Sequence, residues 1–552
     1  MSNNTINSVK WVSIRPSGKT ADYKSGDKLE FEIPRDHAFI DGKQSYLYLE
    51  VENKTTFTDA TTTGSTADYP ACWYSHMGAN GLIQRIQLQD TNGKMLEDVE
   101  QCNSYMGLMN SYGKDQGEYE TTAKVEGVAG HDPTAFNSSV SDPKVNVMYP
   151  VGDTSTNVLS GGNVAVQSSY CLPIPLGLWS QLGNDHQVFP NLALNGTKMN
   201  IYFENPNVCL KDMSHKFTND PQGQGLYQEN YVDVSSAVDC DNVPNVEPHD
   251  EIFISTDVCH TGSHGRGVDF DLSGVGFRNG QAVVVTYTEL AVVKTLKTTI
   301  TEVQEDLGIN SNQIRLKLKD SMDAGNLSDV SVKLSTPVFD YNINKVELRI
   351  LEVMPNDPKP VLQSVARGIN YNTTTLSKLS TASQLKHSVL NIISSMTRAS
   401  SIWVLPCNAE KLTTANESSI VYPQQDENNT TTYQFQIKDF LIPNKEVLVD
   451  KERNASSDNS IYRQQLAMAT RPVFPLKAYG CGDNAKASDL SNPFIIGVQL
   501  APTGNTFNLL DNEVQLRLTN GSTVNTPSRL YHIFVNHTRT LKSGEMGVEV
   551  MI

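Results

Sequence analysis

Side chains that could bind a metal gather in one short stretch, CHTGSH, which contains Cys259, His260 and His264. Thiolate and imidazole groups are the ligands that zinc prefers in proteins. Only three ligands are local and two of them are adjacent, which makes shared tetrahedral coordination awkward. Gly262 and Gly265 favour a surface turn instead. We therefore predict no metal site at this stretch.

An acidic patch lies just upstream of that stretch. Hard carboxylate oxygens at high density can bind calcium, and five acids are close in the sequence here: Asp239, Asp241, Glu247, Asp250 and Glu251. Their spacing does not match the D-x-[DN]-x-[DN]-G calcium loop. The favoured interpretation is a group of solvated loop acids.

Acid–base chemistry has one local candidate, His186 beside Asp185. The short interval to Pro190 makes a turn at the end of a helix the simpler interpretation. The sequence contains no P-loop, no dinucleotide glycine fingerprint, no G-x-S-x-G and no H-E-x-x-H. We predict that the protein is not an enzyme, with no catalytic, cofactor-binding or metal-binding residues and no cofactor.

A few basic residues stand in a segment otherwise rich in serine and threonine: Arg367, Lys386 and Arg398. Such a face could meet an acidic neighbouring subunit. An ordinary solvated face is the favoured interpretation.

Length and charge restrict the class of protein. A chain of 552 residues suits two or three domains. Its 19% charged and 8% aromatic residues leave enough apolar material for packed cores. The net charge of −17 disfavours binding to nucleic-acid phosphates. An assembly unit is therefore a better expectation than a genome-wrapping protein.

Targeting signals and cysteine spacing point to an intracellular site of synthesis. The sequence has no apolar run of about 18 residues, the length that spans a bilayer. The start, MSNNTINSVKWVS, lacks the basic-then-apolar pattern of a secretory signal. The eight cysteines are far apart without a C-x-x-C pair, so we expect free thiols.

Alternation of apolar and polar residues dominates the sequence and predicts a β-protein. Leu29, Phe31 and Ile33 alternate with charged residues, and Pro34 ends that run. Similar alternation occurs at residues 314–318, 346–350, 435–437 and 514–518. Strands of this kind bury one face and expose the other, as in sandwiches.

One longer helix is predicted over Met95–Ser111. Apolar side chains recur there at spacings of three or four, namely Leu96, Val99, Cys102, Met106 and Met109. Gly113 follows and could cap this helix. The pattern predicts a packed helix and not a binding stripe.

The segment from Cys171 to Phe203 combines two strands and one short helix. Pro173 and Pro175 end the first strand, because proline lacks the N–H that a ladder needs. Leu178, Trp179 and Leu182 would then share one face of a short helix. Asn195-Gly196 predicts a tight turn that leads into a strand over Thr197–Phe203.

Turn-rich segments suggest how the chain is divided. Residues 205–336 begin polar and later contain strands, including the region 281–293. The run MPNDPKP is the strongest linker signal and places a boundary near Pro355–Pro360. We predict an N-terminal arm at 1–24, a first domain at 25–355 with a large insertion at 205–336, and a second domain at 356–552.

Cys171–Phe203 resembles a segment of the double jelly-roll major capsid proteins, most of all those of polinton-like viruses and virophages. Tyr23–Val51 and Asn80–Tyr112 resemble the opening strands and the strand, hairpin and helix that follow, and Asn512–Ile552 resembles the closing strands. The resemblance implies an all-β fold with two tandem eight-stranded jelly rolls (a double jelly roll), a few short helices and long inserted loops. It leaves open whether a membrane lies beneath the shell.

The same resemblance implies a function. The protein would form homotrimers with a pseudo-hexagonal outline that tile the icosahedral capsid of a double-stranded DNA virus. Its partners would be itself, neighbouring capsomers, and penton and minor capsid proteins, with no sequence-specific nucleic acid. Its location would be the virion capsid, after synthesis in the host cell without a secretory signal.

A β-sandwich that binds or cleaves carbohydrate is the alternative. Trp73, Tyr74, Trp179 and Trp403 could supply stacking platforms, and scattered acids could supply a carboxylate pair. The sequence marks no such pair. A tail fibre or adhesin would favour repeated β-motifs, which the sequence does not contain.

Overall fold

The computed structural model describes most of the framework of the chain. The described residues are 6–57, 71–73, 77–114, 118, 121, 125–127, 150–151, 169–180, 188–212, 238–240, 249–255, 282–289, 292–305, 313–322, 327–334, 337–409, 430–448, 460–476, 495–501, 505–510, 512–520, 528–544 and 547–551.

The first jelly roll consists of two antiparallel four-stranded sheets. One has the order β1 (Ile6–Ile14), β19 (Tyr341–Pro355), β3 (Ile40–Asn53) and β9 (Ser169–Pro173). The other has the order β2 (Lys28–Ile33), β10 (Thr197–Phe203), β6 (Ile83–Asp90) and β7 (Met95–Glu100). Residues 6–14, which we expected in an N-terminal arm, are therefore an edge strand of this roll, paired with β19.

The second jelly roll repeats this plan. One sheet has the order β20 (Ile369–Thr381), β27 (Arg529–Gly544), β22 (Ala399–Asn408) and β25 (Ile496–Gln499), with β28 (Gly547–Met551) paired to β27. The other has the order β21 (His387–Ile392), β26 (Val514–Asn520), β23 (Thr430–Ile437) and β24 (Phe440–Leu448). In both rolls the eight framework strands are ordered first-eighth-third-sixth and second-seventh-fourth-fifth.

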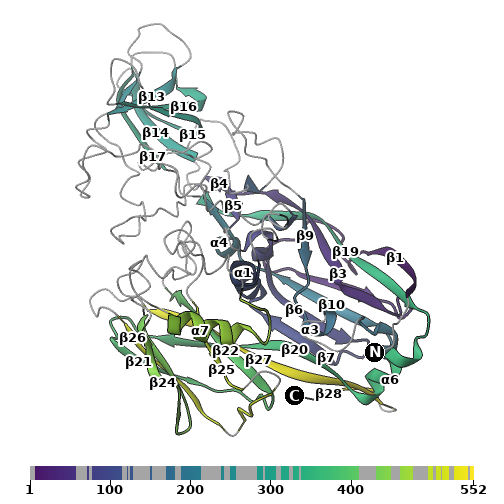
Figure 1. Ribbon diagram of the computed structural model, residues 1–552. Coiled ribbons are helices and arrows are strands. Elements are labelled where there is room, and N and C mark those ends of the chain that lie inside the picture. The colour runs from purple at the N-terminus through teal and green to yellow at the C-terminus, as the bar shows by residue number, and fades with distance from the viewer. Residues whose placement is uncertain are drawn as a thin grey trace.

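Further strands lie in the connections of the first roll. β4 (Thr56–Phe57) pairs with β18 (Pro337–Val338), and β5 (Ala71–Trp73) lies between β11 (Leu210–Asp212) and β8 (Pro150–Val151). The insertion sheet has the order β12 (Val238–Cys240), β13 (His249–Ser255), β16 (Gln313–Met322), β15 (Val292–Glu305), β14 (Ala282–Glu289) and β17 (Leu327–Leu334). Figure 1 shows it at the top, apart from both rolls. The strand region expected at 281–293 is split between β14 and β15, which form a hairpin.

The helices whose bounds the structure describes are short and lie in connections between strands. They are η1 (Gly78–Leu82), α1 (Cys102–Gly113), α3 (Gly177–Ser180), η4 (Asn191–Leu194), α4 (Pro206–Cys209), α6 (Lys359–Arg367) and α7 (Ser460–Thr470). In the described part of the chain, no helix is long and apolar enough to cross a membrane.

The predicted helix over Met95–Ser111 begins too early. Residues 95–100 form β7 and pair with β6, and the helix starts at Cys102 after Gln101, whose φ is 50°. Leu96 and Val99 are buried as strand residues, so their spacing of three does not reflect a helical face. Gly113 is the last residue of α1 and not its cap, because the helix is followed by extended Lys114.

The alternating runs predicted from the sequence all lie in strands, namely β2, β19, β23 and β26 of the rolls and β16 of the insertion sheet. In β2, Leu29, Phe31 and Ile33 are buried and the charged residues between them are more exposed. The predicted Asn195-Gly196 turn is also confirmed. Both residues have positive φ, 58° and 92°, and lead directly into β10. Because alternate residues of the strands are buried, the apolar side chains of each roll face the space between its two sheets.

Candidate functional site

The two jelly rolls meet at a closely packed junction, the roll junction, formed by α3, Glu97 of β7 and residues 371–374 of β20. Two glycines permit the close approach. A Cβ on Gly42 in β3 would lie 2.0 Å from the Trp179 carbonyl oxygen, and one on Gly177 would lie 1.5 Å from the Asn372 carbonyl oxygen. Helix α3 is therefore wedged between a strand of each roll, with backbone against backbone.

Trp179 fixes α3 to the first roll, as the sequence predicts. Its side chain is fully buried, and its ring centroid lies 4.9 Å from that of Phe189. Leu182, the second expected anchor, lies outside the described residues. Burial of a large aromatic side chain makes this short helix part of the core.

Glu97 joins β7 to the start of α3. Its Oε1 accepts the Gly177 N–H at 2.7 Å and its Oε2 accepts the Leu178 N–H at 2.8 Å. Burial raises the pKa of Glu97 from its ordinary value of 4.5 to about 7, although the two N–H bonds and the nearby Arg539 charge act in the opposite direction. The carboxyl group is thus a buried acid that titrates near neutrality.

Hydroxyl and aromatic groups complete the roll junction. The Tyr371 hydroxyl donates to the Leu96 carbonyl at 2.5 Å, which ties β20 to β7. The ring of Tyr105 in α1 stacks on Trp403 of β22, with centroids 5.6 Å apart, and also contacts Phe534. The rolls therefore share one apolar core, in which Trp403 donates its Nε1–H to the Ala469 carbonyl at 2.9 Å.

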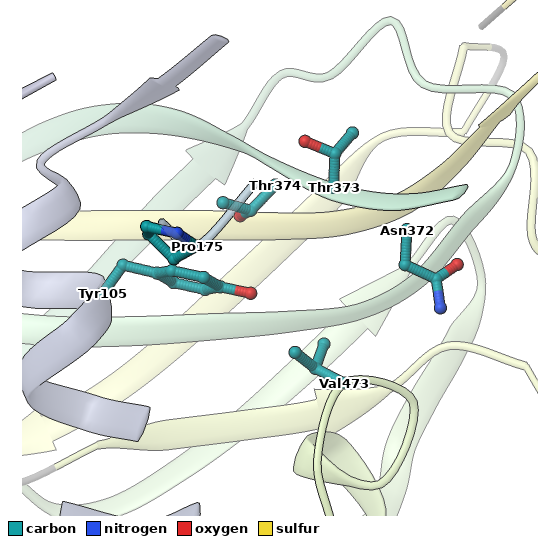
Figure 2. A pocket seen from close by; sticks show the side chains of 6 residues that line it. All are labelled: Tyr105, Pro175, Asn372, Thr373, Thr374 and Val473. Atoms are coloured by element: carbon teal, nitrogen blue, oxygen red, sulfur yellow. The ribbon is translucent and has the colours of Figure 1, made fainter. Parts of the chain in front are cut away.

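A narrow pocket lies in this junction, and Figure 2 shows the side chains that line it. They come from both rolls and are Tyr105, Pro175, Asn372, Thr373, Thr374 and Val473. The lining has no acid, base or thiol apart from the Tyr105 phenol, whose pKa burial raises. It has the character of a packing seam between domains and offers no acid–base pair for catalysis.

A second feature is the outer face of the sheet β1-β19-β3-β9. Trp11 on β1 is largely exposed and lies with its ring centroid 5.7 Å from that of Tyr46 on β3. Arg349 and Lys345 lie over the Tyr48 ring at 4.6 and 5.2 Å from its centroid. Partial burial and a hydrogen bond from its hydroxyl to Glu50 raise the pKa of Tyr48 to about 12. This flat, ordered face suits a macromolecular contact better than a small ligand.

Comparisons with known proteins add the fold relationship. No protein-family model and no curated protein sequence matches the chain. The solved structure of the Faustovirus major capsid protein matches with a TM-score of 0.51 at 8% identity, over 97% of this chain and 90% of that chain. The chain has the fold of a viral major capsid protein.

Two other solved structures are similar at lower TM-scores. VP54 of PBCV-1, fitted into a reconstruction of the virophage Sputnik, gives 0.46 at 9% identity over 100% of this chain and 98% of that one. The mavirus major capsid protein gives 0.35 at 10% identity over 98% of this chain and 90% of that one. The double jelly-roll fold expected from the sequence is confirmed.

The metal and acid–base candidates Cys259, His260, His264, Asp185 and His186 lie outside the described residues. Of the acidic patch, Asp250 and Glu251 lie on β13, where Glu251 is paired in register with Lys317 of β16. Asp241 and Glu247 are not described, and Asp239 belongs to β12. Within the described residues, no three His, Cys, Asp or Glu side chains could hold a metal ion.

The basic candidates do not form one face. Arg398 bonds to Thr540 and lies 3.4 Å from the Asn370 oxygen at the start of β20, close to Arg367. Lys386 follows the far end of β20. Among the cysteines whose side chains the structure describes, Cys102, Cys171, Cys209 and Cys407 carry free thiols.

Two of the four predicted stacking platforms for carbohydrate are not available. Trp179 and Trp403 are fully buried. Tyr74 is not described, and Trp73 belongs to the short strand β5. Sequence reasoning missed the exposed Trp11. Val9 and Trp11 lie on one face of β1, and Val12 and Ile14 lie on the other, so both faces of this strand carry apolar residues. Apolar residues on both faces indicate a strand whose outer face is also covered.

Proposed function

We propose that this chain is the major capsid protein of an icosahedral double-stranded DNA virus, of the polinton-like or virophage type. The observation that carries the proposal is the repeated strand order of two jelly rolls in one chain, a fold shared with the Faustovirus major capsid protein. In this proposal the function is geometric, and the protein needs no catalytic residue.

The capsomer in this proposal is a homotrimer with a pseudo-hexagonal outline. Two similar rolls per chain give six similar walls in a trimer, and flat sheet faces can bury standard-sized contacts repeatedly. The roll junction supports this, because the hydrogen bond from Tyr371 to Leu96 and the close approach of Gly177 to Asn372 hold the two rolls of each chain together. Neighbouring capsomers, penton proteins and minor capsid proteins would be the partners in the virion.

The domain division belongs to the same proposal. The first roll would extend to residue 355 and the second would begin at 356, with α6 in the connection between β19 and β20. Residues 205–336, which include the insertion sheet, would project from the outer surface of the shell. The place of that sheet, apart from both rolls in Figure 1, supports this arrangement.

Electron microscopy of the purified protein in negative stain tests the proposal. We expect uniform particles with a six-cornered outline and a three-fold axis, because three chains supply six rolls. Single two-lobed particles at the concentrations used for assembly would contradict it. Affinity for glycans in such single particles would favour the carbohydrate-binding alternative.

A further inference from the structure

Within one chain, the rolls touch through particular strands. The fifth framework strand of the first roll, β7, contacts the first framework strand of the second roll, β20. The Tyr371 hydroxyl of β20 bonds to the Leu96 carbonyl of β7, and Glu97 of β7 holds α3 against Asn372. The internal contact therefore joins a fifth strand to a first strand.

The equivalent strands at the two ends of the chain are free. Because both rolls have the same strand order, the fifth strand of the second roll is β24 and the first strand of the first roll is β1. Each is the last strand of its sheet, and no strand pairs with its outer edge among the described residues. Figure 1 places β1 and β24 at opposite sides of the molecule.

Both free strands expose large apolar side chains. On β1, Val9 is 58% exposed and Trp11 is 52% exposed. On β24, Phe440 is 71% exposed and Leu441 is 41% exposed. Both strands carry residues that protect a free edge from pairing with another strand, Lys10 on β1 and Pro443, Lys445 and Glu446 on β24. The exposed apolar side chains lie beside these residues, and contiguous apolar exposure marks an interaction site. By contrast, Leu96 and Tyr371 of the internal contact are buried.

We propose that β24 of one copy packs against β1 and the neighbouring outer face of the next copy, so that the contact between copies repeats the contact between rolls. The inference rests on the proposed function and names the self-association surface. Two different surfaces meet, which makes the contact heterologous, and a heterologous contact closes into a ring when its rotation allows. If the rotation that relates neighbouring rolls is the same within a chain and between chains, three copies place six rolls in the ring.

The size and order of the β1 side suit such a contact. The strands β1, β19, β3 and β9 have 9, 15, 14 and 5 residues. At about 3.3 Å per residue and about 4.8 Å between strands, the face of this sheet covers about 700 Å². Each partner in a standard stable interface buries about 800 Å². Trp11, whose ring is tilted against that of Tyr46 at a centroid distance of 5.7 Å, is an aromatic anchor held in place before binding.

Two charge-introducing variants test the inference, Trp11→Asp and Phe440→Asp. Both side chains are exposed in the single chain, so each variant should keep the fold, seen as the circular dichroism spectrum of the wild type, although loss of the trimer contacts would lower the thermal unfolding midpoint. Val293→Asp on the insertion sheet, where Val293 is 67% exposed, is the matched control and should remain trimeric. Native mass spectrometry of each protein alone should show monomers for the two edge variants.

Mixing the two edge variants is the decisive arm. The intact β24 of Trp11→Asp can bind the intact β1 of Phe440→Asp, and the two altered surfaces stop further growth. We expect one-to-one heterodimers and nothing larger. Trimers from either variant alone, or only monomers in the mixture, would overturn the inference. If the wild type is trimeric, the proposed function would remain intact in either case. A monomeric wild type would overturn both.

Discussion

Glu97 is a fully buried carboxylic acid at the roll junction, so its titration should affect the stability of the whole protein. Its pKa is about 7 in the folded chain and near 4.5 when unfolded. The stabilisation from the protonated acid is full below about pH 4.5 and is lost as pH rises through about 7. That difference corresponds to about 3 kcal/mol. The thermal unfolding midpoint of the wild type, relative to that of Glu97→Gln, should therefore decrease as the pH is raised from about 5 to about 8, which is roughly the range of this titration.

The comparison with Glu97→Gln is needed because buried histidines act in the opposite direction. Burial lowers the pKa of His532 and His537 to about 4. Their stabilisation is present above about pH 6.5 and is lost as pH falls through about 4. Both histidines are present in both proteins, so the difference between the two curves isolates Glu97. A difference that stays constant with pH would show that Glu97 does not titrate in this range.

The burial of Trp179 could be inferred from local sequence, whereas the role of Glu97 could not. Trp179 lies in an apolar turn after a proline-ended strand, and this pattern alone indicates a core residue. The N–H partners of Glu97 are 80 and 81 residues away in the sequence. A charged residue in a strand predicts an exposed position, and only the docking of α3 explains its burial.

At the scale of elements, α3 should behave as a wedge that couples the rolls. The Cβ that Gly177→Ala adds would lie 1.5 Å from the Asn372 carbonyl oxygen. We expect a loss of ~1–3 kcal/mol in unfolding free energy from overpacking. Because the strain falls between the rolls, we also expect calorimetry to resolve two unfolding transitions in place of one.

Ser180→Ala is the matched control in the same helix. It removes the hydrogen bond of 2.6 Å from Ser180 to the Leu176 carbonyl and adds no atom. Such a bond contributes about 1 kcal/mol, and the rolls should still unfold together. If Gly177→Ala unfolds like this control, the close approach of α3 to β20 is not important for coupling.

Strand elements could be predicted more fully than helices. Alternation requires only neighbours in the sequence, so β2, β10 and β26 are evident without tertiary information. The helix predicted at Met95–Ser111 merged β7 with α1, because Leu96, Val99, Cys102 and Met106 are spaced as on one helical face. The left-handed conformation of Gln101 separates the two elements, and no residue type there signals it.

At the scale of the whole molecule, the net charge of −17 determines how assembly should respond to salt. Like-charged subunits repel, and the repulsion falls as the screening length shortens to ~8 Å at physiological salt. If apolar wall contacts hold the shell, light scattering should show more assembly as salt rises, with or without duplex DNA. Assembly that needs DNA and weakens steeply with salt would instead indicate phosphate binding.

The most direct test of the central claim is the native mass of the purified, full-length protein. The account predicts a stable species at three times the 60.8 kDa of one chain, because two rolls per chain and a closed ring of six rolls require three copies. A protein that remains at the mass of a single chain across the accessible concentration range would contradict the account.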